Sequence, residues 1–198
     1  MNTTNNSAGT IRVYLGCMFS GKTSEIIREY TRWNKIKKSA ICINFDADNR
    51  YGEDDYVYSH DLNKIECIKT NKLMEIDKNI IQNHDVILIN EGQFFNDLIE
   101  FCQLWCDIFN KHIVVCGLDG DFLRKPFGQI NQLISIADEV TKLKAFCVKC
   151  NDGTPGIFTW RLSNDTNQIS IGNDYIPVCR KHYIELQDVK TISKSQEC

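Results

Sequence analysis

The chain has 198 residues, of which 42% are hydrophobic and 25% charged, and this balance predicts an ordinary globular protein of one or two domains. Its 23 lysine and arginine residues against 26 aspartate and glutamate residues give a formal net charge of −3, so charge offers no general reason to expect nucleic acid or a membrane as a partner. The apolar runs fall short of the roughly 18 residues that span a membrane, and the N-terminus lacks the basic and apolar regions of a secretion signal, so we expect a cytoplasmic protein.

The first predicted elements are a strand, a loop and a helix that together form a phosphate site. After residues 1–10, which we expect to be a disordered leader, alternating apolar residues predict a strand over 11–15. The next eight residues match the pattern Gly-x-x-x-x-Gly-Lys-Ser/Thr, and a helix with one apolar face begins at about Lys22. The candidate ATP ligands are the residues of this loop, Gly16, Cys17, Met18, Phe19, Ser20, Gly21, Lys22 and Thr23.

Glycine, lysine and threonine each have a chemical reason to be in such a loop. The glycines let successive backbone N–H groups point at a phosphate, and the N-terminus of the helix adds positive potential. Lys22 reaches the β- and γ-phosphates, and the hydroxyl of Thr23 can bind Mg²⁺. The alternative is a glycine turn with an exposed lysine, but the flanking strand and helix favour a nucleotide site.

The rest of the first 141 residues alternates between strands and helices. Residues 46–61 form a polar, turn-rich segment that we interpret as a functional loop. The alternation predicts an α/β fold with a mostly parallel sheet, helices on both faces and a ligand at the carboxyl ends of the strands. Further strands are predicted over 40–45, 65–68, 85–89 and 113–116, and helices over 72–82, 95–110 and 129–139.

A second motif lies where the strand over 85–89 ends. Four apolar residues are followed by Asn90 and Glu91, the pattern of the strand that faces the γ-phosphate in phosphate-loop enzymes. Glu91 is therefore a candidate general base, and a solvated glutamate in a turn is the alternative. Hydrolases and phosphotransferases share both motifs, so these leave open whether water or a substrate hydroxyl attacks the phosphate.

A third motif follows a change of pattern near residue 141. We expect a kinase-like core over 11–141, a small β-rich module over 142–187 and a flexible tail over 188–198. The module contains two Cys-x-x-Cys/His pairs that suit a closed, structural Zn²⁺ site, with reduced surface thiols or a redox pair as alternatives. The four candidate ligands are Cys147, Cys150, Cys179 and His182. The other cysteines within apolar elements or the phosphate loop look like small core residues.

Together these motifs resemble those of the type II thymidine kinases, a family with animal cytosolic, bacterial and large-DNA-virus members. The resemblance implies a RecA-like phosphate-loop core and transfer of the γ-phosphate of ATP, with Mg²⁺, to the 5′-hydroxyl of thymidine, with deoxyuridine as a further acceptor. It also implies a homotetramer and dTTP as a feedback ligand. The segments that carry it lie within 18–23, 48–51, 91–95, 118–127 and 178–183.

The resemblance also assigns roles to residues. It implies that Glu91 receives the proton of the hydroxyl, that Lys22 and Arg50 act on the phosphates, and that Asp48 lies near the sugar. The segment between the metal-ligand pairs resembles the family's lasso, a loop that closes over the base. The residues implied to surround the base are Met18, Phe94, Leu118, Phe122 and Phe127, with Thr159 and Tyr175 from the lasso.

Three departures from the family pattern affect these expectations. Asn90 replaces the usual aspartate, so it offers magnesium an oxygen without a charge, and Cys17 replaces a common proline. A single glycine, Gly172, stands where two are usual in the lasso.

Two alternative functions stay open. One is an NTP-dependent, nucleic-acid-binding zinc-ribbon ATPase, which the negative charge disfavours. The other is a catalytically weakened regulatory homologue, which Asn90 motivates.

Overall fold

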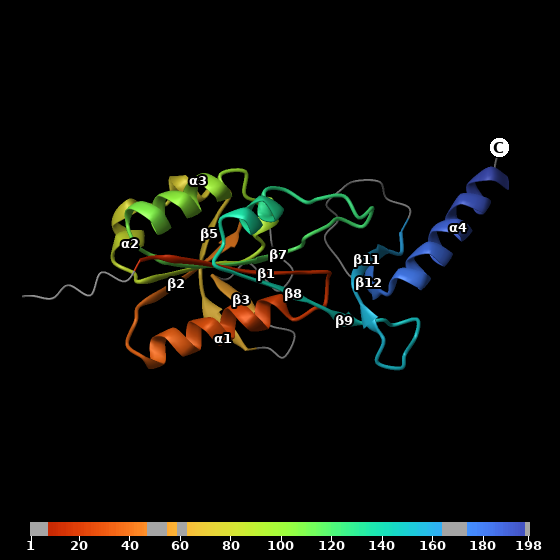
Figure 1. The fold of residues 1–198 in the computed structure, drawn as a ribbon, viewed down its shortest axis with the longest axis horizontal. Coiled ribbons are helices and arrows are strands. Elements are labelled where there is room, and N and C mark those ends of the chain that lie inside the picture. The colour runs from red at the N-terminus through yellow and green to blue at the C-terminus, as the bar shows by residue number, and fades with distance from the viewer. Residues whose placement is uncertain (1–7, 47–54, 59–62, 164–173, 197–198) are drawn as a thin grey trace, which may run out of the picture.

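The computed structural model describes residues 8–46, 55–58, 63–163 and 174–196. Its centre is a sheet of six strands in the order β5-β2-β6-β7-β1-β8, in which every neighbouring pair is parallel (Figure 1). The predicted parallel sheet and α/β class are therefore confirmed. The strands are β1 (Thr10–Gly16), β2 (Ala40–Phe45), β5 (Ile68–Thr70), β6 (Val86–Ile89), β7 (His112–Gly117) and β8 (Glu139–Leu143).

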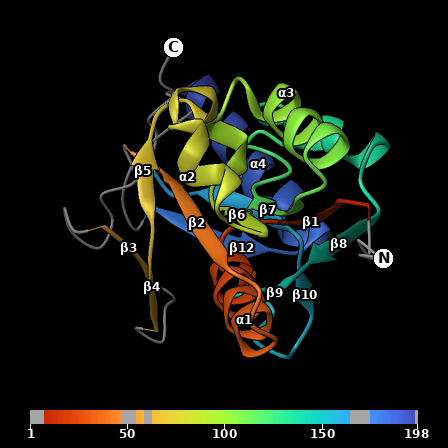
Figure 2. The ribbon, with the colours of Figure 1, turned by 90° about the vertical axis from the view of Figure 1, so that its left-hand side faces the viewer.

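Helices cover both faces of this sheet, so its central strands are buried on both sides. Helix α1 (Lys22–Lys35) lies on one face, and α2 (Lys78–Gln82) and α3 (Leu98–Gln103) lie on the other (Figures 1 and 2). All four residues of β6 have no exposed surface, which explains why the sequence there is continuously apolar. Among the described residues, no helix has both the length and the apolar character required to cross a membrane.

Two helices are shorter than the sequence predicted. The segment 72–82 forms a 3₁₀ turn, η1 (Leu73–Glu75), and then α2, because the side chain of Asp77 accepts a hydrogen bond from the backbone of Asn79 and starts a new helix. The segment 95–110 contains α3, which continues as a π-helical turn, η3 (Leu104–Ile108). Apolar periodicity located both helical regions but did not reveal these interruptions.

The helix predicted over 129–139 is present only as a shorter helix of another type. A 3₁₀ helix, η4 (Ile130–Ser135), is followed by β8, which extends the sheet beside β1 and crosses the predicted boundary after residue 141. Strand β8 is mostly exposed, so it lacks the apolar pattern that marked the other strands. The single strand predicted over 65–68 is instead two strands: β4 (Lys64–Glu66) pairs with β3 (Tyr56–Tyr58), and β5 joins the main sheet.

Residues 145–196, here called the metal module, follow β8 and extend from one end of the sheet (Figure 1). Two antiparallel pairs, β9 with β10 and β11 with β12, precede a helix. The segment predicted as a flexible tail continues this helix to residue 196, in a stretch without proline or glycine. The elements are β9 (Ala145–Phe146), β10 (Pro155–Gly156), β11 (Phe158–Arg161), β12 (Tyr175–Val178) and α4 (Arg180–Gln196).

Candidate active site

The phosphate-loop sequence lies between β1 and α1, as predicted. A Cβ atom at Gly16 would lie 2.6 Å from the backbone oxygen of Leu143 and 2.7 Å from Oγ of Ser20, so a side chain does not fit there. Gly21 caps α1 with a φ of 85°, a left-handed conformation that favours glycine. The two glycines therefore have different roles, the first allowing a close approach of the chain and the second a turn into the helix.

Lys22 points into the loop. Its side chain is only 9% exposed, and its Nζ donates a hydrogen bond to the backbone oxygen of Cys17 at 2.7 Å. Oγ of Ser20 donates to the same oxygen at 2.8 Å. The alternative interpretation of an exposed lysine on a glycine turn does not fit this burial. The half-buried Thr23 follows in the first turn of α1.

The second motif lies at the tip of β6. Only β7 separates β6 from β1 in the sheet, so these two strand ends are about 10 Å apart. Glu91 is 7% exposed, and its Oε2 accepts a hydrogen bond from Nε2 of Gln93 at 2.7 Å. Its φ of 54° is left-handed, an uncommon conformation for a residue other than glycine. A solvated turn glutamate is therefore not what the structure contains.

Asn90 is held by the neighbouring strands. Its Nδ2 donates to Oδ1 of Asn44 on β2 at 2.9 Å, and its Oδ1 accepts from Sγ of Cys116 on β7 at 3.0 Å. Asn90 and Asn44 are each 2% exposed. The sequence analysis missed Asn44, although a polar residue within the apolar strand 40–45 was a signal for it.

Aromatic side chains lie beside the strand tips. The rings of Phe94 and Phe127 meet edge to face with centroids 5.4 Å apart, and Phe45 lies 5.0 Å from Phe94 on the other side. The half-buried Leu118 follows the end of β7. Three of the residues implied to surround the base are therefore near the carboxyl ends of the strands, and Phe45 is an aromatic neighbour that the sequence analysis did not name.

The metal module contacts the phosphate loop directly. Oγ1 of Thr159 on β11 accepts a hydrogen bond from the backbone N–H of Met18 at 3.0 Å. Sγ of Cys17 donates to the backbone oxygen of Gly156 on β10 at 3.2 Å. The structure thus brings Met18 and Thr159 together, although they are 141 residues apart in the sequence. Two of the predicted site residues, Asp48 and Arg50, lie outside the described residues.

The module also contacts the loop that follows β7. The guanidinium of Arg161, which is 1% exposed, lies 3.9 Å from the ring centroid of Phe122 and donates to the hydroxyl of Tyr175, through Nε at 3.1 Å. The hydroxyl of Tyr183 on α4 donates to the backbone oxygen of Phe122 at 2.7 Å. The sequence analysis gave no role to Arg161 or Tyr183. A charged residue in the mostly apolar segment 158–161 was the signal for Arg161, and Tyr183 ends the family segment 178–183.

The four predicted metal ligands form one cluster, with ligand atoms within 4.8 Å of one another. Nδ1 of His182 lies 3.5, 3.4 and 3.4 Å from Sγ of Cys147, Cys150 and Cys179, and the last two sulfurs are 3.8 Å apart. Ligands bonded tetrahedrally to one zinc ion at about 2.3 Å are about 3.8 Å apart, so the donor set and spacing are compatible with zinc. Nε2 of His182 faces Glu185 at 3.7 Å, as metal-bound histidines commonly face a carboxylate.

The thiols of the metal cluster do not all ionise alike, since burial raises the pKa of Cys150 to about 11. At Cys147, burial opposes ionisation, but hydrogen bonds from the backbone of Cys179 and Cys150 and from His182 outweigh it and lower the pKa of the thiol to about 6. A thiolate is the form that binds a metal. Outside the cluster, burial raises the pKa of the Cys42 and Cys102 thiols. The buried thiols outside the cluster are Cys17, Cys42, Cys67, Cys102, Cys106 and Cys116.

Comparison with known proteins agrees with these features. The model of the thymidine kinase family matches residues 9–183, a range that includes the phosphate loop, the tip of β6 and all four cluster residues. The thymidine kinase of vaccinia virus, strain Western Reserve, is 40% identical over 181 residues, which cover 90% of this chain and 99% of that protein. The monkeypox virus thymidine kinase is 39% identical over 181 residues, with the same two coverages.

A relative from an insect poxvirus matches over a similar length. The thymidine kinase of Choristoneura fumiferana entomopoxvirus is 42% identical over 184 residues, which cover 89% of this chain and 97% of that protein. The matches therefore extend over nearly the whole of these relatives. The chain belongs to the thymidine kinase family.

Proposed function

We propose that the protein transfers the γ-phosphoryl group of ATP to the 5′-hydroxyl of thymidine, which gives dTMP. One observation carries the proposal: the buried carboxylate of Glu91 lies two strands away from a phosphate-loop sequence whose lysine points inward. This separation leaves room for a phosphate and an alcohol between them. Family membership supplies thymidine as the acceptor in place of water.

The phosphate loop positions ATP and stabilises its charge. Backbone N–H groups of residues 16–23 cradle the phosphates, and the N-terminus of α1 adds positive potential. Lys22, whose Nζ donates to Cys17 within the loop, moves this donation to the β- and γ-phosphate oxygens. Phosphoryl transfer depends mainly on such positioning and charge stabilisation.

Glu91 accepts the proton of the 5′-hydroxyl as the hydroxyl oxygen attacks the γ-phosphorus. Burial limits the access of water, so the carboxylate faces the bound alcohol in place of solvent. A positioned base of this kind contributes about 10²- to 10⁴-fold to the rate. The proposed role of Arg50 at the phosphates, and of Asp48 at the sugar, follows from the family pattern.

Mg²⁺ and Zn²⁺ have separate proposed sites. Thr23 and Asn90 are the residues that would offer oxygen donors to Mg²⁺, which would neutralise charge on the phosphates of ATP. Oδ1 of Asn90 already accepts from Cys116, and a carbonyl oxygen has a second lone pair for an ion or its water. Zn²⁺ in the four-residue cluster would be structural, because four protein ligands would leave no open coordination position.

The thymine base lies in the proposed pocket between the strand tips and the metal module. The apolar and aromatic side chains of Met18, Phe94, Leu118, Phe122 and Phe127 surround it. A lid that includes Thr159 and Tyr175 closes over the base and excludes water that would otherwise hydrolyse ATP. A homotetramer, a cytoplasmic location, feedback by dTTP and use of deoxyuridine are further proposals from the family resemblance.

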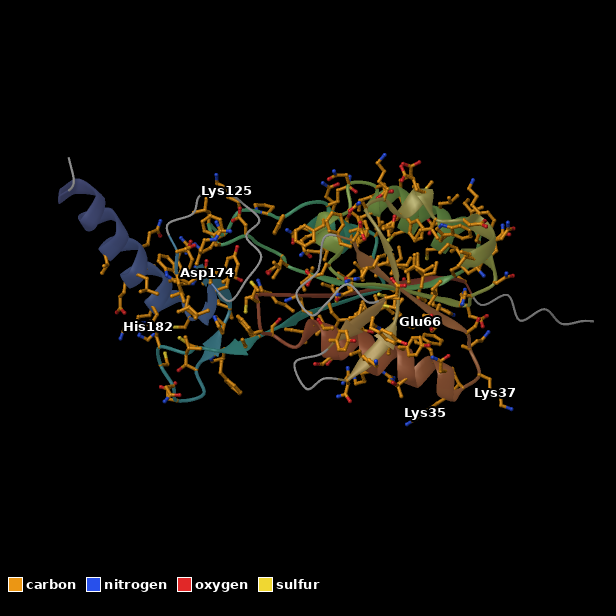
Figure 3. The ribbon with its side chains drawn as sticks, turned by 180° about the vertical axis from the view of Figure 1, so that it is seen from behind. Lys35, Lys37, Glu66, Lys125, Asp174 and His182 are labelled. Carbon is orange, nitrogen blue, oxygen red and sulfur yellow. The ribbon has the colours of Figure 1, made fainter. Side chains whose placement is uncertain are left out.

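The alternative of a nucleic-acid-binding ATPase is not favoured. The chain is acidic overall, and the basic residues Lys35 and Lys37 point outward at the end of α1, at the opposite end of the molecule from His182 (Figure 3). The other alternative is a catalytically weakened regulatory homologue. Phosphorylation of thymidine in a single-turnover experiment would exclude it.

Transfer of labelled phosphate from ATP to a panel of nucleosides tests the proposal. We expect thymidine to be labelled and ribonucleosides not to be. Glu91→Gln should reduce kcat by about 10²- to 10⁴-fold while binding of ATP survives, because the base acts in the transition state. Equal turnover by the Glu91→Gln variant and the parent would contradict the assigned role of Glu91. Label found only in inorganic phosphate, the product of hydrolysis, would contradict the kinase function.

A further inference from the structure

Gln93 connects the proposed base to the loop that follows β7. Its Nε2 donates to Oε2 of Glu91 at 2.7 Å, and its Oε1 accepts from the backbone N–H of Leu118 at 3.0 Å. Gln93 is 2% exposed, so both hydrogen bonds are shielded from water. A single amide thus joins the tip of β6 to the first residue after β7.

The chemistry of the two partners fixes the direction of this amide. A backbone N–H can only donate, so the atom of Gln93 that faces Leu118 must be the oxygen. The NH₂ group of the same amide is then directed at the carboxylate of Glu91, where a donor is needed. Gln93 therefore does more than fill space. Neither a carboxylate nor an apolar side chain could supply both hydrogen bonds.

Two glycines leave room for Gln93 at this position. A Cβ atom at Gly117 would overlap Oε1 of Gln93, and one at Gly128 would overlap its backbone oxygen. Gly128 also has a left-handed φ of 56°. Both glycines approach the glutamine more closely than a residue with a side chain could, Gly117 at the side-chain amide and Gly128 at the backbone.

From this geometry we infer that Gln93 is a positioning residue that orients the carboxylate of Glu91 toward the nucleoside. The terminal torsion of a glutamate is soft, and a hydrogen bond from a fixed donor restricts it. A donor also favours the ionised carboxylate, the form that accepts a proton. The inference rests on the proposed function, in which Glu91 is the base.

The bond to Leu118 gives Gln93 a second consequence. Leu118 begins the segment 118–127, which also carries Phe122 and Phe127, the side chains proposed to surround the base. The same amide therefore keeps the segment proposed to bind the nucleoside at a fixed distance from the carboxylate proposed to deprotonate it. Misplacement by about 1 Å can reduce a rate about 10²-fold, so a rigid link between the two has a kinetic effect.

Two substitutions separate the two bonds. Gln93→Glu keeps an acceptor for the N–H of Leu118 but replaces the donor to Glu91 with a second carboxylate, and close like charges disfavour ionisation of the base. Gln93→Met removes both bonds at similar volume. Gln129→Met is the matched control, because the side-chain oxygen of Gln129 also accepts from a backbone N–H, that of Ile99 in α3, in a bond that involves neither Glu91 nor Leu118.

The experiment measures kcat and the KM values of thymidine and ATP, with thermal unfolding as a check of folding. We expect Gln93→Glu to lose about 10- to 100-fold in kcat with both KM values near those of the parent. Gln93→Met should lose kcat similarly and also raise the KM of thymidine. Gln129→Met should leave all three constants near the parental values.

A parental kcat in a folded Gln93→Glu variant would overturn the inference. If this variant does not fold, Gln93→Met decides: loss of kcat with an unchanged KM for ATP supports the inference, and a parental kcat overturns it. If neither variant folds, Gln93 serves the fold and the inference fails. Glu91→Gln, measured in parallel, separates the two hypotheses, since parental turnover there contradicts the proposed base itself.

Discussion

The core and the metal module reach a fixed structure by different means. In the core, the strands are buried between helices, and the four residues of β6 have no exposed surface. The buried hydrophobic core of the module is small, and two of its five residues are also candidate metal ligands. These five residues are Cys147, Trp160, Val178, Cys179 and Tyr183. Apolar burial therefore stabilises the core, whereas the module depends on a few specific cross-links.

Removal of zinc is the largest expected effect and the strongest test of this comparison. Structural zinc sites contribute about 10–16 kcal/mol of apparent binding energy. Chelation, or Cys147→Ser, should abolish binding of thymidine before it affects binding of ATP, measured by titration calorimetry with zinc content checked. Cys106→Ser, a thiol outside the cluster, should retain the metal. Unchanged thymidine affinity after verified zinc loss would mean that the metal does not hold the lid.

A cavity in the core should weaken binding of both ligands together, whereas loss of zinc should affect thymidine first. Leu88→Ala in β6 removes a fully buried side chain, and such a change costs about 2–5 kcal/mol of the free energy of unfolding. We expect thermal unfolding at a lower temperature, with ATP and thymidine binding lost together as the protein unfolds. Ile36→Ala, at a residue that is 65% exposed, is the control and should change stability by less than about 0.5 kcal/mol. Separate loss of one ligand in Leu88→Ala would break the comparison.

A smaller effect should appear where the module holds a core loop. Tyr183→Phe keeps the ring but removes the hydrogen bond to the backbone oxygen of Phe122, worth about 0.5–1.5 kcal/mol. The KM of thymidine should rise severalfold, with the KM of ATP unchanged. Tyr30→Phe on α1 serves as the control. Equal changes in both KM values would show that Tyr183 acts on general stability and not on the nucleoside loop.

Asn90→Asp should give the smallest effect. It should change the use of Mg²⁺ with ATP and leave thymidine unaffected. A carboxylate at the tip of β6 attracts Mg²⁺ more strongly than an amide does, so the Mg²⁺ concentration for half-maximal rate should fall. The KM of thymidine should stay near its parental value, which makes this variant the counterpart of Tyr183→Phe. An unchanged magnesium curve would mean that residue 90 does not face the metal.

The sequence predicted the features that depend on local pattern. The strands 40–45 and 113–116 were placed within a residue at each end, because burial on both faces makes a strand continuously apolar. The four cluster residues were found because the ligand spacing itself is the signal. Strand β8 was missed because an exposed edge strand has no such apolar run.

Contacts between distant segments could not be predicted in this way. The bond between Gln93 and Leu118 joins two loops that only the order of strands brings together. Asn44 and Arg161 were visible only as polar residues in apolar strands, and the sequence did not say which partners would satisfy them. Periodicity reports which face of an element is buried, but not what it meets there.

The left-handed backbone of Glu91 has a consequence for engineering. A non-glycine residue in this conformation carries a cost of about 1 kcal/mol or more that glycine avoids. A screen that selects only heat resistance would therefore reward Glu91→Gly, and it would enrich stable variants that lack the proposed base. Thermostable variants of this protein should be sought by sorting for turnover at the same time.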